Sequence, residues 1–326
     1  MIRESDISHF LYSRYAVALF AIITIIATHF ALSWGEVTPI INNKGMGLIP
    51  INHWLTFGQT SMWANITLNI AISGLMIYLN KTFNILRNPT IIFAGLFFLL
   101  QCPLTDITGQ LYGGTMLCTI ILICSFILFT TYNNPNTHAI FLIFAILSFF
   151  SFFQYAFLLY TPIIILGCAQ MRILNIRTSL AAIFGIITPP WILFGLGILD
   201  IQNLTFPQFQ SIYESLTSAE ALHMLLIIGL SCFICIGAWV VNIVKIINYN
   251  AQTRAYNGFF ALLSLATILL ILIDFTNYII YIPLLNCCTA MQLGHLFTIH
   301  KSRRSYLGIL GIFVVYLGLY IWGVWI

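Results

Sequence analysis

Long apolar runs with few charged residues fill most of this chain, and they constrain its fold more than any other feature. Hydrophobic residues make up 60% of the 326 residues and charged residues only 6%, whereas soluble domains average about 45–50% apolar and 25% charged residues. A run of about 20 apolar residues can cross the hydrocarbon core of a bilayer as a helix. The runs lack the two-residue alternation of a membrane barrel. The sequence therefore predicts an all-α integral membrane protein.

The pattern predicts about eleven transmembrane helices in a single domain, 1–326. Their approximate ranges are 11–34, 59–80, 90–104, 109–132, 138–151, 153–171, 178–199, 219–245, 258–282, 284–300 and 306–326. The continuous run 139–170 would make one helix about 48 Å long, against a hydrocarbon core of about 30 Å, so we divide it into a hairpin. Residues 35–58 and 200–218 are predicted outer loops, and the first is long enough for an interfacial helix.

Basic residues set the predicted orientation, with the N-terminus inside and the C-terminus outside. Cytoplasmic loops carry the excess of Lys and Arg in membrane proteins. With these spans, eleven of the 12 basic residues fall on the inner side, and only Lys44 falls on the outer side. Because the few basic residues sit in short loops and serve orientation, no nucleic-acid partner is expected.

Asp274 is the only acid inside an apolar run. Such a group near the bilayer centre costs about 2.5–3.5 kcal/mol on insertion scales, so it needs a partner, a wet cavity or a proton. A tight turn predicted at Pro283 would bring Gln292 to the depth of Asp274 and His295 one turn further in. Asn277 shares the helix face of Asp274. These four polar residues form a predicted substrate or proton path; the alternative is that they only hydrogen-bond the helices together.

Glu36 and Asp106 are acids directly at the ends of apolar runs, both on the predicted outer side. Their position suggests a cavity that opens outward. The sequence has no HExxH motif and no phosphate-binding glycine motif. Cys232 and Cys235 have CxxC spacing but lie in an apolar run without polar neighbours, so no resident metal or other cofactor is predicted.

Two other features interrupt the apolar runs. Asn65 and Asn69 lie one turn apart, which suits interhelical hydrogen bonds at least as well as a binding site. Pro189 and Pro190 fall in the middle of a predicted helix, where they would produce either a broken helix, as in transporters, or a kink.

The middle of the chain resembles a family of uncharacterised polytopic bacterial inner-membrane proteins, a domain of unknown function. The resemblance covers about residues 60–195. It rests on the motifs Asn133-Asn134-Pro135, Phe152-Phe153-Gln154-Tyr155, Tyr160-Thr161-Pro162 and Gly185-Ile186-Ile187-Thr188-Pro189-Pro190-Trp191, with Arg172 and Arg177. It implies a multi-pass protein of the bacterial inner membrane and no particular activity.

A more distant likeness is to the GT-C class of membrane glycosyltransferases, which use lipid-phosphate sugar donors. By position, Glu36 and Asp106 match the acidic residues that these enzymes carry after the first span and in the next outer loop. The likeness implies that these two residues are catalytic. A carboxylate would activate an acceptor hydroxyl or hold a divalent metal ion beside the donor phosphate.

Three functions follow from these features. The first is a protein of envelope biogenesis that handles a lipid-linked glycan or lipid substrate at the outer face, through Glu36 and Asp106. The second is a proton-linked transporter or flippase that uses Asp274, and the third is a non-catalytic membrane subunit of an envelope machine. The sequence leaves open whether the protein is an enzyme. The expected partners are the lipid bilayer and either a lipid-linked sugar or other membrane subunits.

Overall fold

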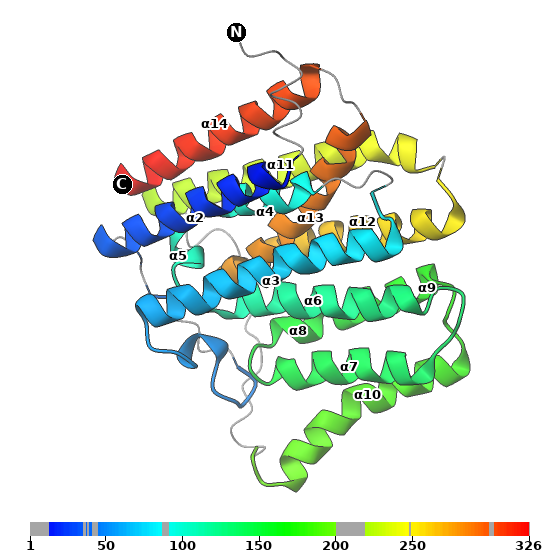
Figure 1. The fold of residues 1–326 in the computed structure, drawn as a ribbon. Coiled ribbons are helices and arrows are strands. Elements are labelled where there is room, and N and C mark those ends of the chain that lie inside the picture. The colour runs from blue at the N-terminus through cyan, green and yellow to red at the C-terminus, as the bar shows by residue number, and fades with distance from the viewer. Residues whose placement is uncertain are drawn as a thin grey trace.

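The computed structural model describes residues 13–34, 37, 39–40, 45–86, 91–199, 219–247, 249–299 and 303–325. Within them the regular structure is helical (Figure 1). The helices are α2 (Arg14–Trp34), η1 (Ile51–His53), α3 (Gln59–Phe83), α4 (Ile92–Gln101), α5 (Thr105–Thr108), α6 (Gly113–Thr130), α7 (Thr137–Ser151), α8 (Ala156–Leu159), α9 (Thr161–Gln170), α10 (Ile176–Gly195), α11 (Ala219–Ile246), α12 (Ala251–Ile273), η4 (Phe275–Asn277), α13 (Tyr278–Ile299) and α14 (Arg303–Trp325).

Eight helices in the described part are long and apolar enough to cross a membrane: α2, α3, α6, α10, α11, α12, α13 and α14. Three shorter apolar segments accompany them, namely α4, α7 and the combined α8 and α9. The prediction of an all-α, multi-pass membrane protein is therefore confirmed for the described residues. The number of eleven spans and the orientation stay predictions.

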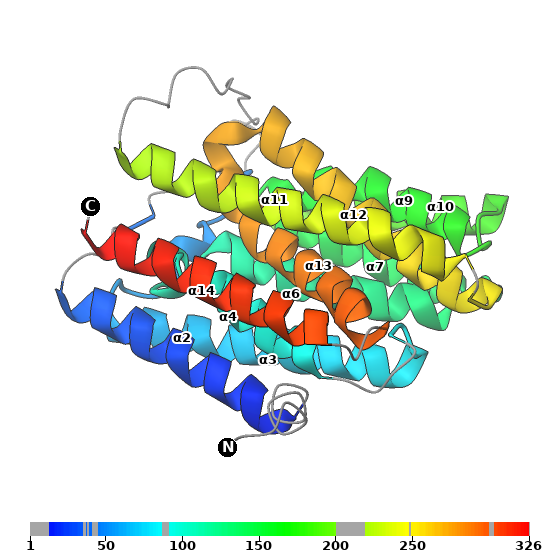
Figure 2. The same cartoon turned by 90° about the horizontal axis from the view of Figure 1, so that it is seen from above.

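Helix α13 forms the centre of the bundle and packs against α4, α6, α11 and α12. Figure 2 shows it between these neighbours. The membrane-spanning part of α13 is 89% buried, compared with 11% in α14. The apolar and small residues of α13 are spread around its whole circumference, and a helix of that kind is stable only when it is surrounded.

The predicted hairpin in the run 139–170 is present. Helix α7 ends at Ser151, the chain reverses at residues 152–155, and α8 and α9 return beside it (Figure 1). Part of the predicted outer loop 35–58 covers this turn, because the Leu48 amide donates to the Phe152 carbonyl at 3.1 Å. The described part of that loop contains the single turn η1. The loop 200–218 lies outside the described residues.

The turn predicted at Pro283 is wrong. Pro283 lies inside α13, and the chain reverses earlier, at residues 274–277, where α12 ends and η4 leads into α13. Pro283 is the sixth residue of α13, where it removes one backbone hydrogen bond of the helix without ending it. Asp and Asn side chains, in contrast, compete for backbone partners and favour helix ends. The polar residues Asp274 and Asn277, and not the proline, therefore mark this turn.

The segment between α4 and α6 is buried although most of it is not helical, and polar side chains satisfy its backbone. The Asn65 amide of α3 donates to the carbonyls of Ile107 at 2.8 Å and Thr108 at 3.0 Å. Ser61 Oγ accepts from the Leu111 amide at 2.8 Å. Irregular backbone at membrane depth is stable only when protein or water supplies such partners. Asn65 thus makes the interhelical contact that its position suggested, whereas the Asn69 amide bonds Asn65 of its own helix.

Replacing Asn65 with leucine is expected to lower the free energy of unfolding by about 1–3 kcal/mol for each carbonyl left without a partner. The measurement is the thermal midpoint of the purified protein in detergent. The matched control is Thr67→Val on the same helix, because the exposed Thr67 hydroxyl bonds only Trp63 one turn earlier. Equal midpoints for both variants would contradict the role given to Asn65.

Candidate functional site

The carboxylate of Asp274 is fully buried and has three hydrogen-bond donors. Its Oδ2 accepts from the Tyr281 hydroxyl at 2.8 Å and from the Tyr155 hydroxyl, and its Oδ1 accepts from the Asn277 amide at 2.7 Å. All three donors are neutral. We call Asp274, Asn277, Tyr155 and Tyr281 the Asp274 site.

Three segments of the chain position this site. Asp274 caps the end of α12, where its amide donates to the Leu270 carbonyl at 2.8 Å. Asn277 ends η4, and Tyr281 lies in the first turn of α13. Tyr155 comes from the turn between α7 and α8, 119 residues before Asp274, and also accepts from the Asn277 amide.

A second polar pair lies beside the site. The ring of Tyr160 is 6.4 Å from that of Tyr281, and its hydroxyl is 3.1 Å from Thr267 Oγ1. The polar groups therefore continue from Asp274 toward the middle of α12.

The chemistry of the Asp274 site follows from its donors. Three donors around one carboxylate satisfy its oxygens in a buried place. Because they are neutral hydroxyl and amide groups, any of them could be exchanged for a substrate hydroxyl. The site is thus suited to receive a hydroxyl-bearing group.

Asp106 lies near the Asp274 site, on a different helix. It is half-buried in α5 and interacts electrostatically with Tyr278, four residues after Asp274. The Gln110 amide donates to the backbone carbonyl of Asp106 at 2.9 Å, and its Oε1 accepts from the Ile40 amide at 3.0 Å. The other predicted catalytic acid, Glu36, lies outside the described residues, so the pairing of the two acids stays a prediction.

The structure brings Asn277 to Asp274, but it does not bring Gln292 or His295 there. The Asn242 amide of α11 donates to Oε1 of Gln292 at 3.0 Å, and His295 bonds Asn257 of α12. Because the turn lies at residues 274–277, Gln292 is about 21 Å along α13 from its first residue. These two residues therefore make interhelical hydrogen bonds away from the Asp274 site.

Sequence reasoning did not assign Tyr155 to the site, although one signal was available. Gln154 and Tyr155 are polar residues in the middle of the long apolar run 139–170. They mark the hairpin turn. The partner of Tyr155 lies on a helix more than one hundred residues later in the chain. A local sequence pattern cannot identify such a partner.

An apolar groove of about 350 Å³ lies between α7 and α10. Gly185 allows close helix packing there, since a Cβ added to it would lie 2.6 Å from the Phe141 carbonyl oxygen. Helix α10 continues through Pro189 and Pro190, so these residues do not break the helix. The groove is lined by Phe141, Ala145, Ile146, Phe149, Phe150, Thr188, Pro189, Ile192 and Leu193.

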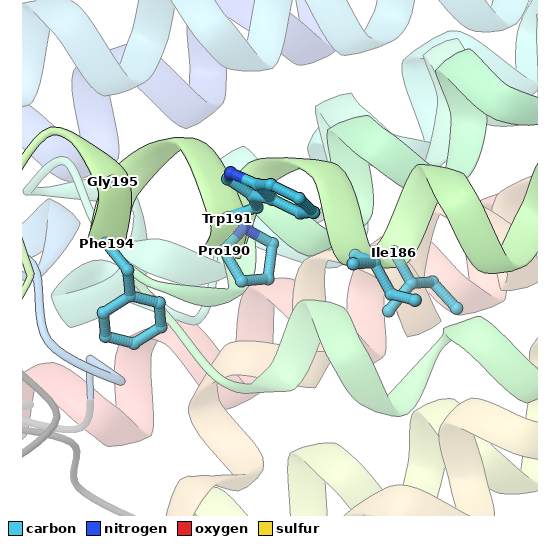
Figure 3. Close-up of a pocket in the computed structure, with 6 residues that line it drawn as sticks. Ile186, Pro190, Trp191, Phe194 and Gly195 are labelled. Carbon is cyan, nitrogen blue, oxygen red and sulfur yellow. The ribbon is translucent and has the colours of Figure 1, made fainter.

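The outward face of α10 forms a second, shallow apolar hollow. Figure 3 shows Ile186, Pro190, Trp191 and Phe194 around it. The side chain of Trp191 is 74% exposed. Such a surface is stable in contact with lipid chains.

The turn between α7 and α8 connects the last groove residue of α7 to the Asp274 site. Phe150, which lines the groove, has its ring 6.1 Å from that of Phe153 and 5.4 Å from that of Phe157. Tyr155 lies between these two residues in the chain and donates to Asp274. The turn that follows the groove residue Phe150 thus carries the tyrosine that bonds the buried carboxylate.

Metal sites and known relatives give no further guide to function. In the part of the chain that the structure describes, no group of three or more His, Cys, Asp or Glu side chains could hold a metal ion. No protein-family model, no curated protein and no solved structure matches this chain. Its function therefore has to be inferred from the residues themselves.

Proposed function

We propose that this chain is a multi-pass protein of the bacterial inner membrane, with its N-terminus inside, that handles a lipid-linked polar substrate at the outer face during envelope biogenesis. The observation that carries this proposal is the short link from the apolar groove to the Asp274 site: Phe150 lines the groove and packs on Phe153 and Phe157, and Tyr155 between them donates to Asp274. An apolar pocket with a few convergent polar groups is the usual form of a small-molecule site.

The groove between α7 and α10 takes the apolar chain of the substrate. Its lining is almost wholly apolar, and the helix that forms one wall carries exposed apolar side chains. In a bilayer such a groove is filled by a lipid chain, because hydrocarbon is the surrounding solvent. An acyl or isoprenoid chain fits this lining.

The Asp274 site takes the polar head of the substrate. The Tyr155 hydroxyl comes from the turn that follows the groove residue Phe150, so we assign it as the donor that a substrate hydroxyl replaces. Asp274 then accepts a hydrogen bond from that hydroxyl, which favours a glycan or another hydroxyl-rich head group. Asp106, beside Tyr278, supplies a second carboxylate at the same end of the bundle.

A proton-linked transporter or flippase is the second candidate, and the burial of Asp274 favours it. Of the four residues in that hypothesis, only Asp274 and Asn277 share a site, so it now depends on these two. The subunit hypothesis requires a partner protein, and surrounding lipid covers the exposed apolar helix faces equally well.

Native mass spectrometry of the protein gently extracted from its own membranes tests the proposal. The expected result is a bound lipid with a hydroxyl-rich head group. Ala145→Phe, which fills the groove, is expected to reduce this lipid severalfold. Ile183→Phe is the matched control, because Ile183 lies on the exposed face of α10, with 51% of its surface exposed.

The head group is tested by Asp274→Asn, which keeps the size of the side chain and removes its charge. We expect this variant to retain a lipid chain but to exchange the hydroxyl-rich lipid for bulk phospholipid. A stoichiometric partner protein with only bulk phospholipid on the unmodified chain would instead favour the subunit hypothesis.

A further inference from the structure

A small cavity lies where α2, α3, α4 and α5 meet, away from the Asp274 site. Its volume is about 10 Å³, which is close to the minimum of about 10–15 Å³ that holds one water molecule. The residues that line it are Thr24, Ile25, Thr28, Ile66, Asn69, Phe98, Gln101 and Thr108. Five of these eight residues are polar, although the cavity lies inside an apolar bundle.

The Gln101 side chain is the unusual feature of this cavity. It is 1% exposed, and neither its amide oxygen nor its amide nitrogen has a hydrogen-bond partner in the protein. The Oδ1 atom of Asn69, a residue that is 6% exposed, also has none. Most buried polar side-chain atoms have a protein or water partner. Three such atoms lining one cavity indicate a bound polar molecule.

The threonine hydroxyls around the cavity already donate their hydrogens to other protein groups, but their oxygens can still accept hydrogen bonds. Thr24 Oγ1 donates to the Phe98 carbonyl at 3.0 Å or to that of Phe20 at 2.9 Å, and Thr28 Oγ1 is 2.8 Å from Thr108 Oγ1. Each hydroxyl oxygen has two lone pairs. The cavity therefore offers a donor at Gln101 and several acceptors, so its ligand must both accept and donate hydrogen bonds.

We propose that one water molecule binds in this cavity, accepting from Nε2 of Gln101 and donating to Oδ1 of Asn69 and to a threonine oxygen. The small volume excludes larger ligands. Among the described residues none that lines the cavity is an acid, and this neutral lining favours a neutral ligand over a dehydrated cation. The water links α2, α3 and α4 through hydrogen bonds and is therefore a structural water rather than a substrate. This proposal is independent of the proposed lipid substrate.

High-resolution density maps of the unmodified protein and of Gln101→Leu test the proposal. The expected result is a peak within hydrogen-bond distance of Gln101 and Asn69 that is absent from the variant. A cavity without density in the unmodified protein would overturn it.

Thermal unfolding in detergent gives a second test. With water bound, Gln101→Leu removes a partner of the water and lowers the midpoint. In a dry cavity the same change removes an unpaired amide, so a raised midpoint would overturn the proposal. The midpoint of the unmodified protein is expected to be the same in sodium chloride and in choline chloride of equal ionic strength. Stabilisation by sodium alone would identify a cation in place of water.

Discussion

Asp274→Ala is expected to lower the free energy of unfolding by about 3 kcal/mol or more. The change removes the acceptor of three buried donors, the hydroxyls of Tyr155 and Tyr281 and the amide of Asn277. Each buried donor left without a partner costs about 1–3 kcal/mol. The measurement is chemical or thermal unfolding of the purified protein in detergent, followed by intrinsic fluorescence.

Two further variants separate the parts of this effect. Tyr281→Phe removes one donor and leaves the carboxylate two others, so a loss of about 1 kcal/mol is expected. Asp274→Asn keeps an acceptor oxygen and should fall between Tyr281→Phe and Asp274→Ala. If Asp274→Ala unfolded at the same midpoint as the unmodified protein, the Asp274 site would not be the hydrogen-bonded cluster described above.

Gly185→Val is expected to have the second large effect, because it forces α10 away from α7. A Cβ at this position would lie 2.6 Å from the Phe141 carbonyl oxygen and 2.9 Å from Cβ of Phe144. Helix α10 packs chiefly on α7, and overpacking of such a contact typically costs about 1–3 kcal/mol. The thermal midpoint should fall, and native mass spectra should lose the groove lipid.

The matched control is Gly195→Val on the same helix. The nearest atom to a Cβ there is in Trp191 of α10 itself, at 3.8 Å, which is an ordinary contact. Both variants add the same side chain to α10, and Gly→Val is not unfavourable for a helix interior, so a loss of stability confined to Gly185→Val comes from packing against α7. Equal stability and equal lipid retention of the two variants would contradict the close contact at Gly185.

Most of the helix pattern could be predicted from the sequence, because it depends on local hydrophobicity. Apolar runs identified the helical segments, and the length of the run 139–170 required a break that the structure contains. The three-residue spacing of Asp274 and Asn277 also predicted their proximity, since it joins neighbours on one turn. Asn65 was expected either to bond another helix or to belong to a binding site, because a polar group in an apolar run needs a partner.

The tertiary structure alone decided which distant polar groups meet. Tyr155 reaches Asp274 only because the turn between α7 and α8 lies against the junction of α12 and α13. Gln292 and His295 bond Asn242 and Asn257 because α13 runs through the centre of the bundle with polar neighbours along its length. Hydrophobicity along the chain specifies that a segment is buried. Which helices contact one another depends on their packing in three dimensions, and the residues of a single segment do not determine that packing.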